Sequence, residues 1–187
     1  KFGSIQPNNS KNLYKIINSI KHASNNNNIV GIILDLSEFT SPGISSTKEI
    51  RDALLEFKQA GKFIYTYSTL LSQTGYYLGS VSDSIFLYPN GNMELSGLSS
   101  TIPFFTETLK ELGIKPEVIR HGKFKAAVEP FLLTKMSAEN KEQTSLLLND
   151  IWFSMLSDIS ESRQIDTKEL NLIANDITNS ILPEKSL

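Results

Sequence analysis

Apolar residues recur along this chain at two spacings, one typical of amphipathic helices and the other of strands inside a sheet. The apolar residues of segment 10–24 fall on one helical face and are Leu13, Ile16, Ile17 and Ile20. Asparagines at positions 25–28 end that pattern and predict a turn. The next segment, IVGIILDLS at 29–37, is too continuously apolar for a half-exposed strand, so we expect a strand buried on both faces.

A second helix is predicted where Ser46 and Glu49 form a capping-box pattern. Its apolar face comprises Ile50, Ala53, Leu54 and Phe57, and Gly61 is expected to end it. The stretch TGYYLGSVSDS at 74–84 predicts a short helix with small residues suited to close packing. We interpret the tyrosines of this region as core and helix-packing residues, namely Tyr65, Tyr67, Tyr76 and Tyr77.

Helix and strand patterns continue to alternate towards the C-terminus. Strands are expected at 62–68, at 85–89, where Pro89-Asn90-Gly91 is expected to stop the strand, and at 116–120. Helices are expected at 103–113, from Ser137 onwards, and after a capping box formed by Asp166 and Glu169. The buried side of the helix from Ser137 is expected to include Leu146, Leu147, Ile151, Met155 and Leu156.

This alternation predicts an α/β layered domain with mostly parallel strands and flanking helices. The 187 residues are enough for one domain of ordinary size. We expect that domain to span residues 1–165. Residues 166–187 are expected to form a helical tail, or the start of a linker to a C-terminal half that is absent from this chain.

Composition narrows the possible functions. A net charge of −2 gives no basic surface for nucleic acid, and no polybasic stretch for an anionic membrane is visible. The chain has no cysteine, which excludes disulfides, thiolate metal sites and cysteine nucleophiles. The longest apolar run, 29–34, is far shorter than the roughly 20 residues of a membrane-spanning helix. Because the polar N-terminus lacks an initiator methionine, we expect a piece of a longer protein, with any membrane anchor outside it.

Few side chains offer catalytic or metal-binding chemistry. His22 and His121 are the only histidines, too few and too far apart for a metal site or a histidine triad, and we expect no metal or cofactor. Asp35 and Glu38 follow a predicted strand, where α/β sheets often place ligands. They fit either a catalytic carboxylate pair or, in the interpretation we favour, capping and loop solvation.

One lysine has mostly small and apolar neighbours in the sequence. Lys125 lies in HGKFKAAVEPF, followed by two alanines, a valine and then Glu129. A lysine acts as a general base only when neutral, which requires its pKa to fall from about 10.4 to roughly 7–8. Apolar neighbours favour that fall by desolvation, and a nearby Glu129 carboxylate would oppose it. From these residues alone, the other interpretation is an ordinary solvated lysine.

The segment GKFKAAVEPF resembles the lysine motif of the signal peptide peptidase A (protease IV) family of S49 serine peptidases. Further blocks that resemble the family are DALLEFKQAGKFIYTYS, SQTGYYLGSVSDSIFLYPNG and MSAENKEQTSLLLNDIW, so that the resemblance covers residues 29–166. It implies a ClpP/crotonase-like α/β fold and a serine–lysine dyad that hydrolyses peptide bonds. In long members, the N-terminal half carries the lysine base and the C-terminal half carries the serine. Lys125 occupies the lysine position.

The serine position departs from the family pattern. Gln73 stands where the nucleophile would be, and Ser72 is one position away on a predicted tight turn. We therefore expect residues 1–165 to be the lysine-bearing half of a long-form peptidase, inactive alone. The serine would come from the C-terminal half or a neighbouring subunit.

The resemblance also implies peptide substrates such as signal peptide remnants, a homo-oligomer, and tethering to the cell membrane with the catalytic part on the extracytoplasmic (periplasmic) side. Two alternatives stay open: a non-catalytic assembly module in which Lys125 pairs with a carboxylate such as Glu129, and acyl-CoA chemistry on the same fold.

Overall fold

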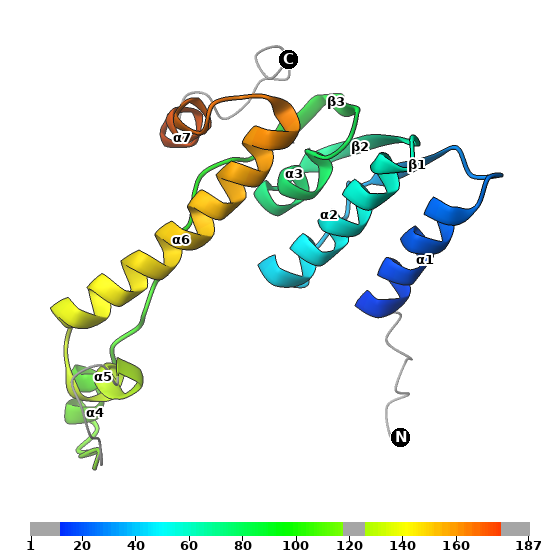
Figure 1. Ribbon diagram of the computed structural model, residues 1–187. Coiled ribbons are helices and arrows are strands. Elements are labelled where there is room, and N and C mark those ends of the chain that lie inside the picture. Colours follow the sequence, from blue (N-terminus) through cyan, green and yellow to red (C-terminus); the bar gives the residue numbers. More distant parts are fainter. Residues whose placement is uncertain (1–11, 118–125, 177–187) are drawn as a thin grey trace, which may run out of the picture. The chain divides into compact units, whose positions relative to one another are not determined.

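The computed structural model describes residues 12–117 and 126–176 (Figure 1). The chain divides into two compact units. The first comprises residues 1–96 and 157–187, and the second comprises residues 97–156. The expected boundary after residue 165 stays a prediction.

The first unit is built on a parallel sheet. Its strands are β1 (Gly31–Asp35), β2 (Phe63–Leu71) and β3 (Ser84–Met93), in the order β1-β2-β3. Both neighbouring pairs are parallel, so that Ile33 lies opposite Tyr65 and Tyr67 lies opposite Phe86. The α/β layered architecture with parallel strands and flanking helices is therefore confirmed.

Helices alternate with these strands along the chain and cover one face of the sheet. They are α1 (Leu13–Asn25), α2 (Ile44–Gln59) and α3 (Gln73–Gly79) (Figure 1). Asn12 caps α1 by accepting a hydrogen bond from the N–H of Tyr14. The predicted apolar face of α2 is confirmed, because Leu54 and Phe57 are fully buried and Ile50 and Ala53 nearly so. From Ile64 to Ser68, every second residue of β2 is buried on the same side.

The opposite face of the sheet is exposed and largely aromatic. Phe63, Tyr65 and Tyr67 alternate with the buried residues of β2 and are 38–39% exposed. Phe86 on β3 is 54% exposed. Ile33 on β1 is 73% exposed, which contradicts the expectation that this strand is buried on both faces. The assignment of Tyr65 and Tyr67 to the core was also wrong, whereas Tyr76 and Tyr77 on α3 are buried.

Two element boundaries differ from those predicted for the first unit. Strand β3 continues through Pro89-Asn90-Gly91 to Met93, with a register irregularity opposite Ser68–Leu70. A Cβ at Gly91 would lie 2.5 Å from the carbonyl oxygen of Thr69, so only glycine allows this approach. Helix α2 begins at Ile44, two residues before the predicted Ser46 cap.

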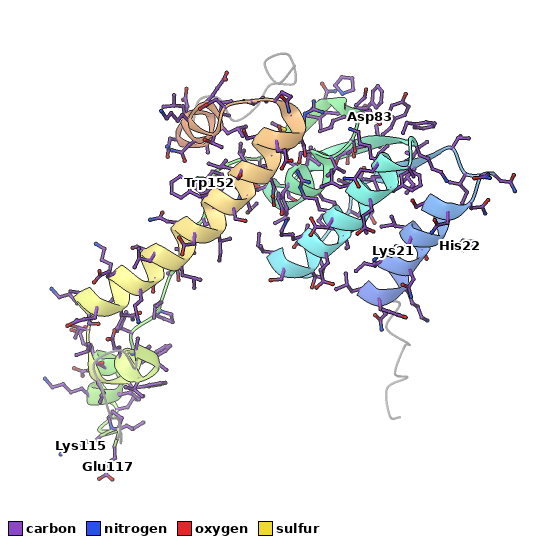
Figure 2. All side chains as sticks on the ribbon, viewed as in Figure 1. Lys21, His22, Asp83, Lys115, Glu117 and Trp152 are labelled. Atoms are coloured by element: carbon purple, nitrogen blue, oxygen red, sulfur yellow. The ribbon has the colours of Figure 1, made fainter. Side chains whose placement is uncertain are left out.

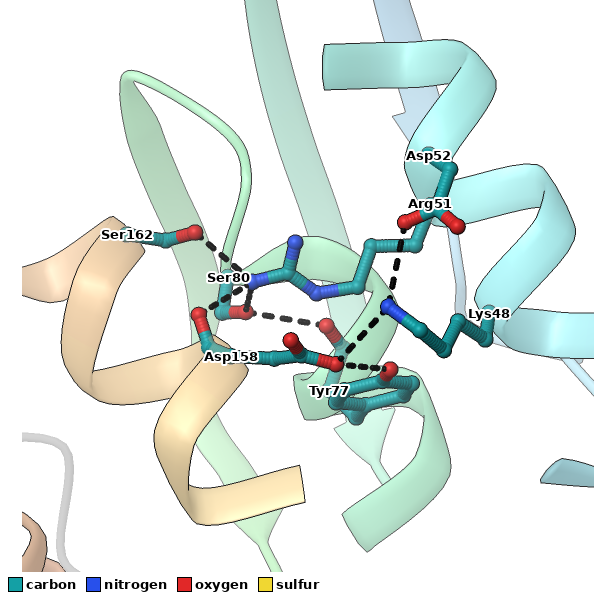
Figure 3. Close-up of polar contacts among 7 residues, drawn as sticks. All are labelled: Lys48, Arg51, Asp52, Tyr77, Ser80, Asp158 and Ser162. Atoms are coloured by element: carbon teal, nitrogen blue, oxygen red, sulfur yellow. Dashed lines mark hydrogen bonds and ion pairs between the residues drawn. The ribbon is translucent and has the colours of Figure 1, made fainter. Parts of the chain in front are cut away.

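A buried polar network joins three helices of the first unit (Figure 3). Arg51 of α2 is 1% exposed, and one of its terminal nitrogens donates to the Asp158 carbonyl oxygen at 2.5 Å and to Ser162 at 2.7 Å. Its guanidinium also lies 5.2 Å from the centre of the Tyr77 ring. The Tyr77 hydroxyl donates to the Asp158 carboxylate at 2.6 Å, and Lys48 pairs with the same carboxylate at 3.3 Å. These contacts bind the C-terminal part of α6 to α2 and α3.

The second unit is mainly helical in its described part. It contains α4 (Thr106–Glu111), a 3₁₀ turn η1 (Ala126–Val128), α5 (Glu129–Leu132) and the start of α6 (Ala138–Arg163). Helix α4 starts three residues later than predicted. Residues 118–120 of the predicted strand 116–120 lie outside the described residues.

The long helix α6 begins directly after Ser137, where a helix was predicted to open. Ser137 accepts a hydrogen bond from the N–H of Asn140 at 3.2 Å. Met155 and Leu156 are buried as expected, whereas Leu146 and Leu147 are 57% and 60% exposed, contrary to prediction. After α6, α7 (Thr167–Asn175) is capped by Asp166 as predicted.

Leu54→Ala should lower the free energy of unfolding by about 2–5 kcal/mol, because the Leu54 side chain is fully buried and its removal leaves a cavity. Urea denaturation of the chain measures this change. Leu172→Ala makes the same substitution at a 69% exposed helical position and should change the value by less than about 0.5 kcal/mol. Equal losses in both variants would contradict the described core.

Tyr77→Phe should lower the free energy of unfolding at neutral pH by about 2 kcal/mol, because it removes a hydrogen bond to a carboxylate. Burial, followed by the hydrogen bond to Asp158, raises the pKa of Tyr77 above its ordinary value. Above about pH 10 the unfolded chain therefore releases a proton that the folded chain retains, and stability falls as pH rises.

Denaturation between pH 8 and 11 should thus show a shallower alkaline loss for Tyr77→Phe than for the unsubstituted chain. Tyr14→Phe, at a 70% exposed position, is the control and should keep the original slope. An unchanged slope in Tyr77→Phe would refute the contribution of this hydroxyl.

Candidate active site

The proposed base and the nearby histidine lie outside the described residues. Lys125 and His121 both fall between Glu117, the last described residue before the gap, and Ala126, the first after it. Figure 2 labels Lys115 and Glu117 on the near side of that gap. The geometry that bears on Lys125 is therefore that of the polypeptide directly following it.

Glu129 anchors this following segment to the start of α6. Its side chain is buried, with a relative exposure of 2%. One carboxylate oxygen accepts from the Ser137 hydroxyl at 2.5 Å. The other accepts from the Ser137 N–H at 3.2 Å and the Asn140 amide at 2.9 Å. The carboxylate thus lies at a helix N-terminus, where the helix dipole favours negative charge.

The same segment is also tied to α4. The N–H of Phe105 donates to the Pro130 carbonyl at 2.7 Å, and the Thr106 hydroxyl donates to the Leu133 carbonyl at 2.5 Å. The rings of Phe105 and Phe131 stack with their centres 6.1 Å apart. Residues 126–133 are therefore held both to the start of α6 and to the N-terminal end of α4.

Ser72 and Gln73 occupy a strand-to-helix turn, as predicted. Strand β2 ends at Leu71 and α3 begins at Gln73, so Ser72 is the N-cap. The Ser72 side chain accepts from the Gly75 N–H at 3.2 Å, the ordinary structural use of a serine at this position. The side-chain oxygen of Gln73 accepts from the Ser96 N–H at 2.9 Å, which ties this turn to the chain after β3.

Asp35 and Glu38 have the local setting that we favoured over a catalytic pair. Asp35 accepts a hydrogen bond from the Ser37 N–H at 3.0 Å. That backbone bond, assisted by the Ser37 hydroxyl, holds the pKa of Asp35 below its usual value. Ser37 in turn accepts from the Thr69 N–H at 3.2 Å, and Glu38 is exposed. Asp35 therefore stabilises the turn after β1.

His22 and Lys21 are exposed on α1 (Figure 2). Within residues 12–117 and 126–176, no three histidine, cysteine or acidic side chains are arranged to hold a metal ion. No helix in the described part of the chain is long and apolar enough to cross a membrane.

Two polar clusters escaped the sequence interpretation. We considered Glu129 only as a possible partner of Lys125. Ser137, eight positions later, offers a hydroxyl that donates to the same carboxylate. The contact between Arg51 and Asp158 had no local signal, because 107 positions separate the two residues.

Comparisons with known proteins identify the family to which this chain belongs. The sequence profile of peptidase family S49 matches residues 56–180. The chain belongs to peptidase family S49, as the resemblance predicted, and its architecture is consistent with the ClpP-like fold.

The similar proteins are much longer than this chain. It is 35% identical over 158 residues to Protease 4 of Salmonella typhi and 36% identical over 152 residues to Protease 4 of Haemophilus influenzae. The alignments cover 84% and 81% of this chain but 26% and 25% of those proteins. A third relative is the Serine protease SPPA, chloroplastic, of Arabidopsis thaliana, 34% identical over 134 residues, covering 72% of this chain and 20% of the relative. The chain thus spans about a quarter of the length of the two bacterial relatives.

Ser72→Ala should lower the free energy of unfolding by about 1 kcal/mol, because α3 loses its N-cap acceptor. Ser72→Asp retains an acceptor and should stay within a few tenths of a kcal/mol of the unsubstituted chain. Thermal and urea denaturation measure both variants. A neutral Ser72→Ala would show that this hydroxyl does not act as the cap.

Proposed function

We propose that this chain supplies the lysine general base of a serine peptidase, with Lys125 as the base. The nucleophilic serine would come from a C-terminal half of a longer protein or from a neighbouring subunit. The observation that carries the proposal is the GKFKAAVEPF segment in a chain of family S49. The capping role of Ser72 and the glutamine at position 73 support a nucleophile located elsewhere.

The chemistry requires a neutral amine. Lys125 would accept the proton of the serine hydroxyl as the serine oxygen attacks a peptide carbonyl. It would then pass that proton to the leaving amine, and water would hydrolyse the acyl-enzyme. Lowering a lysine pKa by about 3 units requires about 4 kcal/mol of bias against the ammonium, which desolvation in a closed site supplies. The oxyanion donors would lie beside the serine, outside this chain.

The substrates that fit this proposal are peptides such as remnants of signal peptides. The same proposal includes a homo-oligomer that is attached to the cell membrane through a segment outside this chain and acts on the extracytoplasmic side. These properties come from the family resemblance, and peptidase names among the relatives support only the hydrolytic part.

One observation favours a second candidate, a non-catalytic assembly module. The exposed side chains of the sheet, including Ile33, Tyr67 and Phe86, form an apolar surface of the kind that marks interaction sites. In that case the chain would build a larger particle, and Lys125 would form a structural ion pair. The two candidates differ in whether peptide hydrolysis depends on this lysine.

Lys125→Ala in the full-length protein should abolish hydrolysis of a fluorogenic peptide, since no other group would take the serine proton. Lys125→Arg should fail equally, because a guanidinium stays protonated at neutral pH. Lys123→Ala removes a lysine two positions away and should retain activity. Unsubstituted protein should lose activity as the pH falls through the lowered pKa of the base. Full activity in Lys125→Ala would refute the proposal.

A further inference from the structure

Burial in the segment after Lys125 is concentrated in one polar side chain. Across η1 and α5, Glu129 alone among the described residues is buried. The apolar residues Phe131, Leu132 and Leu133 are 44%, 37% and 36% exposed. Apolar packing therefore contributes little here, and directional hydrogen bonds determine where this stretch of backbone lies.

We propose that Glu129 is a positioning residue for the lysine base, an inference that rests on the function proposed above. Its carboxylate links the residues after Lys125 to the first turn of α6 through Ser137 and Asn140. Asn140 is itself 8% exposed, so this link is shielded from competing water. It connects a one-turn helix to a helix of 26 residues, which gives the short element a rigid support.

The anchor is close to Lys125 along the chain. Only η1, Ala126–Val128, separates Lys125 from Glu129 along the chain. A general base must come within about 2.6–3.2 Å of the proton it takes. A displacement of about 1 Å can cost roughly 100-fold in rate. Loosening the Glu129 link should therefore reduce turnover while leaving substrate binding by other parts of the enzyme intact.

The test compares two ways of breaking the link in the full-length peptidase. Glu129→Gln leaves one acceptor oxygen where the carboxylate has two, and it removes the charge that strengthens the hydrogen bonds from Ser137 and Asn140. The Ser137→Ala/Asn140→Ala double variant keeps Glu129 and removes two of its donors. Each should lower kcat at least 10-fold with KM changed less than 3-fold, at a temperature where circular dichroism shows the variant folded. Glu139→Gln, an acid in the first turn of α6, is the matched control and should keep kcat.

The pH dependence separates positioning from a direct charge effect on the lysine. Positioning predicts that both variants keep the midpoint of the pH–kcat profile. If Glu129→Gln alone lowers that midpoint while the double variant has unchanged kcat, Glu129 acts on Lys125 by its charge, and the positioning role is overturned. Unchanged kcat in both variants also overturns it.

Lys125→Ala, measured alongside, separates this inference from the proposed function. An inactive Lys125→Ala together with fully active Glu129 and Ser137/Asn140 variants refutes the positioning role alone. An active Lys125→Ala refutes the proposed base itself. If Glu129→Gln does not fold, the double variant decides the result, because it retains the carboxylate.

Discussion

The first unit is organised around one buried cation. Arg51 is 1% exposed, and a guanidinium removed from water is tolerated only where acceptors and counter-charge surround it. The Asp158 carbonyl and the Ser162 hydroxyl from α6 supply acceptors, and the ring of Tyr77 from α3 lies within cation–π distance. Desolvation lowers the pKa of Arg51, and the nearby Tyr77 and Asp158 act against that fall. The guanidinium therefore links α2 to α3 and to the end of α6.

Each unit thus has its own buried charged group with partners on α6. In the first unit the cation Arg51 meets the C-terminal part of that helix, and in the second the carboxylate of Glu129 meets its first turn. At the N-terminus of this helix the helix dipole favours the anion. Near the other end, the cation is bound by the Asp158 carbonyl and the Ser162 hydroxyl. Short elements with little buried apolar surface, such as η1 and α5, can in this way still be held in place.

Local sequence predicted what local physics determines. Asn12 lies just ahead of the predicted helical face that it caps, and Asp166 caps a helix where the capping pattern placed it. The helix predicted from Ser137 onwards is also present, and Ser137 caps it. The parallel α/β layering followed from the alternation of strand and helix patterns. Lys125 was singled out by its apolar neighbours, but its assignment as the base came from the family resemblance.

The wrong predictions share a physical cause. An apolar run such as IVGIILDLS reports that side chains avoid water, but not whether the described chain itself covers them, and Ile33 is 73% exposed. Strand β3 continues past Pro89 because Gly91 has no Cβ and lets Thr69 of the neighbouring strand approach closely. No local sequence pattern reveals this contact. The Glu129 network likewise needs Ser137 and Asn140 from another helix.

The aromatic side of the sheet has a consequence for how this polypeptide behaves in water. Phe63, Tyr65, Tyr67 and Phe86 line the solvent side of adjacent parallel strands, with ring-to-ring contacts of 4.8 Å and 5.8 Å among three of them. Such a surface promotes association between molecules, and a net charge of only −2 offers little electrostatic repulsion to oppose it. The tendency of the isolated chain to self-associate therefore depends on its concentration and on whether another surface covers these rings.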